Sequence, residues 1–265
     1  MVLNRAIFKV TGVDAARYLN GQLTNDVLSL DEGHSIFSFV CDAKGKILGE
    51  LWVRQSSGGV FYLDVDVSQR ESLFLRLSRY LIADDAEIED VSDSLQMVLA
   101  DEEKVGGLVD LALSSWVTPR YGEGVKEYLV PVEEVERSPL KLQAGLQERQ
   151  RVQAGFPGWG SELSLGLLPA ETGLVPIAVS FTKGCYTGQE VVSRMKTAGK
   201  VNKLLVKIKL SEEASATELL NSEGEAVGEI TSSIGLCGIA LLKVRKVTTG
   251  EALKTSDGVE VSWLV

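Results

Sequence analysis

Residues 181–190 read FTKGCYTGQE, and this stretch carries more structural information than any other in the chain. Two of its glycines flank Cys185 closely, so the backbone there can turn tightly or let a ligand approach. Thr187 is followed three residues later by Glu190, which fits a capping box at a helix N-terminus. The pattern therefore predicts a loop that feeds a helix, with the cysteine just before the helix begins.

Cations gather around this stretch. From residue 183 to residue 203 the chain has five cations and one anion, within a chain whose net charge is −10. A basic segment in an acidic protein favours an anionic ligand, for which a small polycarboxylate or phosphate suffices. Lys183 and the helix N-terminus both favour a thiolate at Cys185. The alternative is a capped helix whose lysines only keep the surface solvated.

Composition places the chain among ordinary globular proteins. It has 265 residues, of which 45% are hydrophobic and 24% charged, enough for one large or two modest cores. The sequence pI of about 4.8 argues against direct binding of nucleic acid. No apolar run approaches the roughly 18–20 residues of a membrane helix, and the N-terminus shows no signal pattern. We therefore expect a cytoplasmic protein with no membrane contact.

The cysteines and the single histidine exclude several site classes. Cys41, Cys185 and Cys237 are widely spaced and odd in number, so neither a disulfide framework nor a resident metal site is expected. His34, the single histidine, lies between Gly33 and Ser35 at an expected loop-to-strand junction, and one histidine without a serine or cysteine partner argues against a hydrolase triad.

The chain divides by its pattern of strands and helices. Strands and helices mix over residues 1–199, which predicts an α+β region of two lobes, about 1–95 and 96–199. Residues 35–53 predict a hairpin in that region, with Gly45 at its turn. From about residue 200 to 265, short strands separated by turn residues predict a small β-barrel.

Residues 183–190, KGCYTGQE, match the signature Lys-Gly-Cys-Tyr-x-Gly-Gln-Glu, and the chain therefore resembles the YgfZ-type folate-binding proteins. These proteins are relatives of the glycine-cleavage T-protein, an aminomethyltransferase. Eight contiguous positions make the match specific. The resemblance extends along most of the chain, through residues 8–15, 23–26, 44–47, 151–155, 169–171 and the final barrel.

The resemblance implies a fold of mixed-sheet lobes around a central channel, followed by the barrel. It implies tetrahydrofolate, or a one-carbon derivative, as the cofactor. The family is linked to assembly or repair of iron–sulfur clusters in client enzymes, and through some of these to tRNA modification. Folate and iron–sulfur client or assembly proteins are therefore the expected partners, without direct contact to nucleic acid.

The resemblance also assigns roles to residues. Cys185 is the reactive thiol, and the loop around it is shaped by Lys183, Gly184, Tyr186, Gly188, Gln189 and Glu190. Glu171 resembles the carboxylate that accepts hydrogen bonds from the pterin ring, a role that suits an acceptor with two oxygens. Arg194 and the lysines after it would meet the glutamyl carboxylates. The remaining expected folate contacts are Asn25, Asp26, Trp159 and Lys203.

One departure from the T-protein pattern leaves three hypotheses open. T-proteins have an Asp-Asp pair where this chain has Gly49-Glu50, and a carboxylate displaced by about 1 Å can lower a rate roughly a hundredfold. The leading hypothesis is a folate-binding accessory protein in which Cys185 acts. The alternatives are a folate-dependent one-carbon (aminomethyl) transferase and a non-catalytic folate-binding scaffold, so whether any turnover occurs stays open.

Overall fold

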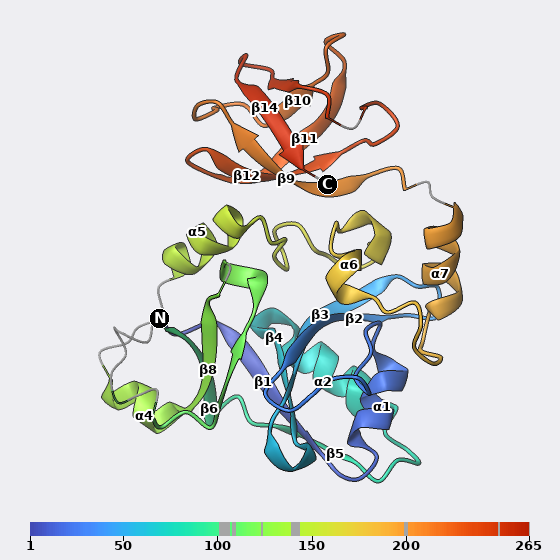
Figure 1. Cartoon of the computed structure of the whole chain (residues 1–265), viewed down its shortest axis with the longest axis vertical. Helices are drawn as coiled ribbons and strands as arrows, with labels where there is room; N and C mark the ends of the chain where they lie inside the picture. The colour runs from blue at the N-terminus through green and yellow to red at the C-terminus, as the bar shows by residue number, and fades with distance from the viewer. Residues whose placement is uncertain are drawn as a thin grey trace.

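The computed structural model contains two open sheets and one closed barrel, with the helices packed against and between them (Figure 1). This arrangement confirms the predicted α+β class with a C-terminal β-barrel. The structure describes residues 1–100, 107, 110–122, 124–138, 144–198, 201–248 and 250–264. Most of a helix predicted near residues 102–110, and the start of one predicted from residue 141, lie outside the described residues.

The first sheet has five antiparallel strands in the order β2-β3-β4-β1-β5. The predicted hairpin forms its β2-β3 pair, and Gly45 at the turn has a φ of +72°, a conformation that favours glycine. One face packs on two helices in a core that includes Leu51 and Leu73. The elements are β1 (Arg5–Thr11), α1 (Ala15–Gln22), β2 (Ser35–Cys41), β3 (Ile47–Gln55), η1 (Ser57–Gly59), β4 (Phe61–Asp66), η2 (Val67–Gln69), α2 (Arg70–Arg79) and β5 (Glu87–Asp90).

The second sheet is smaller and has the strand order β6-β8-β7. The helix α4 (Val132–Arg137) lies at the end of this sheet far from the barrel, whereas α5 (Ala144–Ala154) and α6 (Val175–Ala178) lie between the open sheets and the barrel (Figure 1). None of the described helices is both long enough and apolar enough to cross a membrane. The elements are β6 (Leu95–Ala100), β7 (Ser114–Val117), η4 (Pro119–Tyr121), β8 (Lys126–Pro131), α4 (Val132–Arg137), α5 (Ala144–Ala154), η5 (Pro169–Glu171), α6 (Val175–Ala178) and α7 (Gln189–Ala198).

Six short antiparallel strands close the barrel in the order β10-β11-β12-β9-β14-β13. The last strand of the chain pairs with β9, so the barrel exposes no free strand edge. Its interior is filled by hydrophobic side chains, among them Leu219 and Val227, which are fully buried. The strands are β9 (Leu204–Leu210), β10 (Glu218–Leu220), β11 (Ala226–Ile234), β12 (Cys237–Leu242), β13 (Leu253–Thr255) and β14 (Glu260–Leu264).

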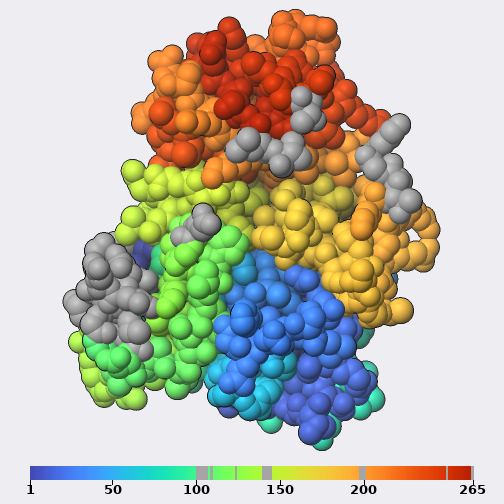
Figure 2. Space-filling view, in the orientation of Figure 1, coloured from blue at the N-terminus to red at the C-terminus, as the bar shows by residue number. Residues whose placement is uncertain are grey.

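A buried carboxylate, that of Glu162, fixes the barrel to the rest of the chain. Arg151 Nη1 of α5 donates to it at 2.8 Å, and the hydroxyl of Ser232 in β11 donates to it at 2.5 Å. Nearby, a Cβ added at Gly173 would lie only 2.5 Å from the carbonyl oxygen of Leu205 in β9. Figure 2 shows that the barrel packs closely against the residues beneath it.

A second set of buried charges joins the two open sheets. Arg54 Nη2 and Arg120 Nη2 both donate to Asp64 Oδ2, at 2.5 and 2.6 Å. Arg54 and Arg120 also form ion pairs with Glu127 of the second sheet. Arg5, on β1 of the first sheet, forms an ion pair with Asp64. Asp64 and Glu127 are fully buried. The contact between the sheets therefore depends on arginine–carboxylate pairs as well as on hydrophobic packing.

We expect Asp64→Asn to lower the free energy of unfolding by about 3–5 kcal/mol at pH 7, because it leaves buried arginines without a charged partner. Urea denaturation measures this change. Asp93→Asn is the matched control, since Asp93 pairs with Arg70 at an exposed position where an ion pair contributes little.

The same carboxylate predicts a dependence on pH. Burial alone would raise the pKa of Asp64, but Arg120, Arg5 and Arg54 lower it far below its ordinary value of 3.8. Its contribution to stability is therefore complete above about pH 4 and is lost as the pH falls toward the folded-state pKa. Between pH 4 and pH 2 the wild type should lose more stability than Asp64→Asn. Parallel loss in the two proteins would contradict this assignment.

Candidate functional site

Cys185 is exposed and lies in the loop that precedes α7. Figure 1 shows this loop at the lower end of the helix. The other two cysteines differ from it. Cys41 is buried, and burial raises the pKa of its thiol to about 12, while Cys237 is partly buried. The loop is closed on itself by Gln189, whose backbone N–H donates to the carbonyl of Tyr186 at 3.2 Å. The predicted loop-to-helix junction therefore exists, and it presents a thiol to solvent.

The capping box predicted for this helix is wrong. The helix begins at Gln189, and the carboxylate of Glu190 accepts a hydrogen bond from Arg194 at 2.6 Å. Both side chains of that pair are exposed. The backbone N–H of Thr187 donates to the carbonyl of Gly21 at 3.3 Å. A cation one helical turn away competes for the carboxylate, which the Thr-x-x-Glu pattern does not reveal.

The ammonium of Lys183 is buried and serves the backbone of another segment. Its Nζ donates to the carbonyls of Asn20, Leu23 and Asn25, at 2.6, 2.8 and 2.6 Å. Burial lowers the pKa of Lys183 to about 8, and the charge of Asp26 opposes that shift. Since three carbonyls occupy this ammonium, it cannot serve as a free cation for the thiol, as the sequence suggested.

Asn25 is also used inside the protein. Its Nδ2 donates to the carbonyls of Phe37 and Ile177, both at 2.8 Å. The carboxylate of Asp26 accepts from the backbone N–H of Leu28 at 3.1 Å. These hydrogen bonds fix the segment that Lys183 holds.

Two glycines bring the hairpin turn against the signature segment, residues 183–190. Gly188 has a φ of +87°, and a Cβ added there would lie 2.5 Å from the carbonyl oxygen of Asp42 and 2.9 Å from Gly45 Cα. A Cβ added at Gly45 would lie 3.0 Å from Cβ of Val191. Both glycines are therefore required by close approach of the two segments as well as by backbone conformation.

Tyr186 packs beside Lys183, whose Nζ lies 5.0 Å from the centre of its ring. The ring is buried, and burial raises the pKa of its hydroxyl to about 12. That hydroxyl has no hydrogen-bond partner among the described residues. Lys183, Tyr186 and Gly188 thus serve the internal structure of the segment, whereas the side chain of Cys185 faces outward.

Glu171 lies in η5 and is half-buried. Its Oε2 accepts from the backbone N–H of Leu168 at 2.9 Å, which closes the turn. A cavity of about 70 Å³ lies between this turn and α7, with Phe181, Met195 and Lys196 in its wall. That volume is far below the roughly 300–1,000 Å³ typical of drug-sized ligand sites.

Trp159 borders a much larger cavity, of about 540 Å³, between α2, β3 and the loop after Trp159. Its polar wall contains Gln69, Ser72 and Arg76. An aromatic face, an amide and a guanidinium are groups that can stack on and hydrogen-bond a flat polar heterocycle. Among the predicted folate contacts, Trp159 thus has the surroundings best suited to a ring.

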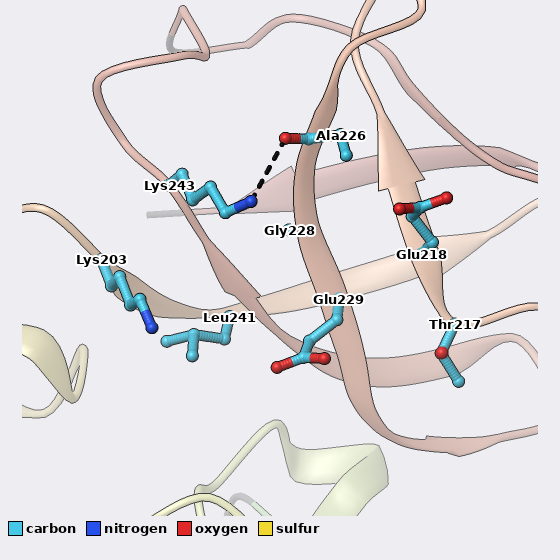
Figure 3. A pocket seen from close by; sticks show the side chains of 8 residues that line it. All are labelled: Lys203, Thr217, Glu218, Ala226, Gly228, Glu229, Leu241 and Lys243. Carbon is cyan, nitrogen blue, oxygen red and sulfur yellow. Dashed lines mark hydrogen bonds between the residues drawn. The ribbon is translucent and has the colours of Figure 1, made fainter.

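Lys203 lies on the barrel, in the wall of a third cavity, of about 220 Å³ (Figure 3). Trp159 and Lys203 therefore line different cavities, and Glu171 closes a turn beside the smallest one. In contrast, Asn25 and Asp26 lie together with the signature segment.

Glu50, the carboxylate at the T-protein-like position, is buried and paired. Its Oε1 accepts from Arg5 Nη1 at 2.8 Å, and its backbone N–H donates to Gln69 Oε1 at 3.3 Å. Some buried donors have no acceptor within the described part of the chain, and they lie on the same strand and beside it: Trp52 Nε1, and further nitrogens of Arg54 and Arg120. An unsatisfied buried donor costs about 1–3 kcal/mol, so this region suits a ligand rich in acceptor atoms, as folate is.

These donors were missed from the sequence, although a signal for them exists. Glu50, Trp52 and Arg54 alternate along β3 and therefore point to one side of the sheet. Two charged residues flanking a tryptophan on a buried face indicate a polar interior. No group of three or more His, Cys, Asp or Glu side chains in the described part of the chain is arranged to hold a metal ion.

The chain is similar in sequence to several known proteins. The C-terminal β-barrel domain of CAF17 matches residues 172–265. An uncharacterized protein of Haemophilus influenzae is 30% identical over 249 residues, which cover 90% of this chain and 85% of that protein. The tRNA-modifying proteins YgfZ of Klebsiella pneumoniae and Escherichia coli are 30% and 28% identical, over 73% of this chain and 66% of each relative.

A solved structure has the same fold. The glycine cleavage system aminomethyltransferase T from Bartonella henselae superposes with a TM-score of 0.79, over 100% of this chain and 84% of that one. At 15% identity this likeness concerns the fold alone, and it confirms the expected T-protein-like architecture. The signature segment, the barrel and these relatives together show that the chain belongs to the YgfZ-type family, built on the aminomethyltransferase fold.

Proposed function

We propose that this protein binds tetrahydrofolate and acts as an accessory factor in iron–sulfur cluster assembly or repair, and through it in tRNA modification. The exposed thiol of Cys185 carries the proposal, because it reaches solvent whereas Lys183 and Tyr186 of the same segment are buried. The relatives from Klebsiella pneumoniae and Escherichia coli are named tRNA-modifying proteins, which supports the proposed link to tRNA modification. A cytoplasmic location stays a prediction from the sequence.

The thiol needs a partner for this role. One thiolate cannot hold an iron–sulfur cluster, since such clusters take several cysteine ligands. Among the described residues Cys185 belongs to no group of three or more His, Cys, Asp or Glu side chains that could hold a metal ion. A client or assembly protein would therefore supply the other ligands, with Cys185 exposed to meet it.

Folate would be held by residues of the lobes. The indole of Trp159 offers a stacking face, and Gln69 offers an amide close to Glu50. The buried donors of Trp52, Arg54 and Arg120 would satisfy carbonyl oxygens. Bound tetrahydrofolate would supply a carrier for one-carbon units.

The transferase hypothesis has less support. In a transferase the carboxylate near the folate nitrogen must be free to act on it. Glu50 is instead held by Arg5 in a buried ion pair. Freeing it would expose a buried arginine charge to an environment without water, which is costly. We therefore place the chemistry at Cys185.

Folate binding should depend on the cavity and not on the thiol. Titration of the purified protein with tetrahydrofolate, followed by tryptophan fluorescence or calorimetry, should give saturable binding. Trp159→Ala should weaken it about tenfold through loss of ring stacking. Gln69→Ala should also weaken it, because Gln69 lines the same cavity as Trp159, whereas Cys185→Ser should bind like the wild type.

Glu190→Ala is the control for that titration, because Glu190 is exposed and lies outside the cavity. Wild-type affinity in both Trp159→Ala and Gln69→Ala would exclude the proposed folate site.

Function in cells should depend on the thiol. In a strain that lacks this protein, wild type should restore the activity of iron–sulfur enzymes, and Cys185→Ser should not. Cys237→Ser should restore it fully, because Cys237 lies in the barrel away from the signature segment. Normal enzyme activity with Cys185→Ser would remove the thiol from the mechanism.

Lys183→Met tests the structural role of the signature lysine. The variant removes three hydrogen bonds from a charged donor and leaves three carbonyls without a partner. Hydrogen exchange should accelerate at least tenfold in residues 20–25, since one such bond contributes about 1.5–3 kcal/mol.

Lys196→Met is the control for this substitution, because Lys196 is exposed on α7 and lies over the ring of Phe181. Exchange in residues 20–25 that is equally slow in wild type and Lys183→Met would contradict the assignment.

A further inference from the structure

The outer face of the barrel carries a pocket in which opposite charges are separated. It has a volume of about 220 Å³, and its charged lining residues are Lys203, Lys243, Glu218 and Glu229. Figure 3 shows the two lysines on one side and the two glutamates toward the other, with Leu241 between them. The pocket lies in the barrel, away from the signature segment and from the cavity beside Trp159.

The strand register explains this separation. Glu218 of β10 is directly opposite Glu229 of β11. Lys203 and Lys243 lie opposite each other just beyond the ends of β9 and β12, where the backbone N–H of Val244 donates to the carbonyl of Asn202 at 3.1 Å. Like charges directly opposite each other destabilise a sheet. The barrel therefore holds two unfavourable pairs, of opposite sign, on one face.

Within the described part of the chain, no ion pair neutralises the two glutamates or the two lysines. Among the described residues neither glutamate carboxylate is engaged in an ion pair or a hydrogen bond, and Lys203 is not ion-paired either. Lys243 Nζ only donates to the carbonyl of Ala226, at 3.4 Å. The lining between the two pairs is Ala226, Gly228 and Leu241, and none of these can bridge the opposite charges.

We propose that this pocket binds a zwitterionic ligand about the size of a dipeptide. Its carboxylate lies at Lys203 and Lys243, and its ammonium group lies at Glu218 and Glu229. Adjacent strands are about 4.8 Å apart and every second residue about 6.8 Å along a strand. The two pairs lie two strand spacings and two residues apart, so they are separated by about 12 Å before the side chains reach inward. The volume, below that of drug-sized sites, also suits a small ligand.

This assignment changes the role expected for Lys203. A glutamyl tail of folate carries only carboxylates, and Glu218 and Glu229 would repel it within the same pocket. A ligand with both a carboxylate and an ammonium group pairs with the lysines on one wall and with the glutamates on the other. The inference is independent of folate binding, since it uses only the barrel.

The test is an NMR titration of the full-length protein with three related compounds. Glycylglycine carries both charges, N-acetylglycylglycine only the carboxylate, and glycylglycinamide only the ammonium group. Glycylglycine should give saturable shifts at the backbone amides of Gly228 and Leu241. Each blocked compound should bind about five- to tenfold more weakly, because it loses the ion pairs at one wall.

Two double variants locate the charges. Glu218→Gln with Glu229→Gln, and Lys203→Gln with Lys243→Gln, should each weaken glycylglycine about five- to tenfold. Glu212→Gln with Glu213→Gln is the matched control, since both residues are exposed on the barrel outside the pocket, and it should bind normally.

Removal of like charges should leave the barrel at least as stable, so thermal unfolding of the double variants checks that they are folded. Equal shifts with all three compounds, absence of saturation, or unchanged binding in both pocket variants would overturn the proposal.

Discussion

The carboxylate of Asp64 is the position on which the contact between the two open sheets depends. Arg5 and Arg54 of the first sheet and Arg120 of η4 converge on it, and their positive charge keeps it ionised although it is fully buried. Arg5 also holds Glu50, so the same cluster fixes the residue at the T-protein-like position. One group of charges therefore determines both how the two sheets pack and which reactions Glu50 can take part in.

The signature segment combines two roles that its sequence does not distinguish. Lys183, Tyr186 and Gly188 act inward, on the backbone of residues 20–25 and on the hairpin turn. Cys185 acts outward, because its side chain is exposed. A residue pattern shared by a family can thus combine the residues that build a loop with the residue that the loop presents.

Local patterns made much of the fold predictable. The hairpin, the loop before α7 and the six-stranded barrel follow from alternation, glycine positions and turn residues close together in the chain. The pairs that matter most at the site were not predictable. Arg54 and Glu127 are 73 positions apart, and Lys183 is 160 positions from Leu23. Residue type alone does not select among so many distant partners.

The contact between Gly45 and Gly188 has a consequence for how this protein tolerates change. A side chain at Gly188 would meet Asp42 and Gly45 of the turn, and a side chain at Gly45 would meet Val191 at the start of α7, so neither position accepts a larger residue unless the other segment moves. Substitution at the turn therefore displaces the loop that carries the thiol, and substitution in the loop displaces the turn. In a saturation-mutagenesis screen these two distant sites would behave as one.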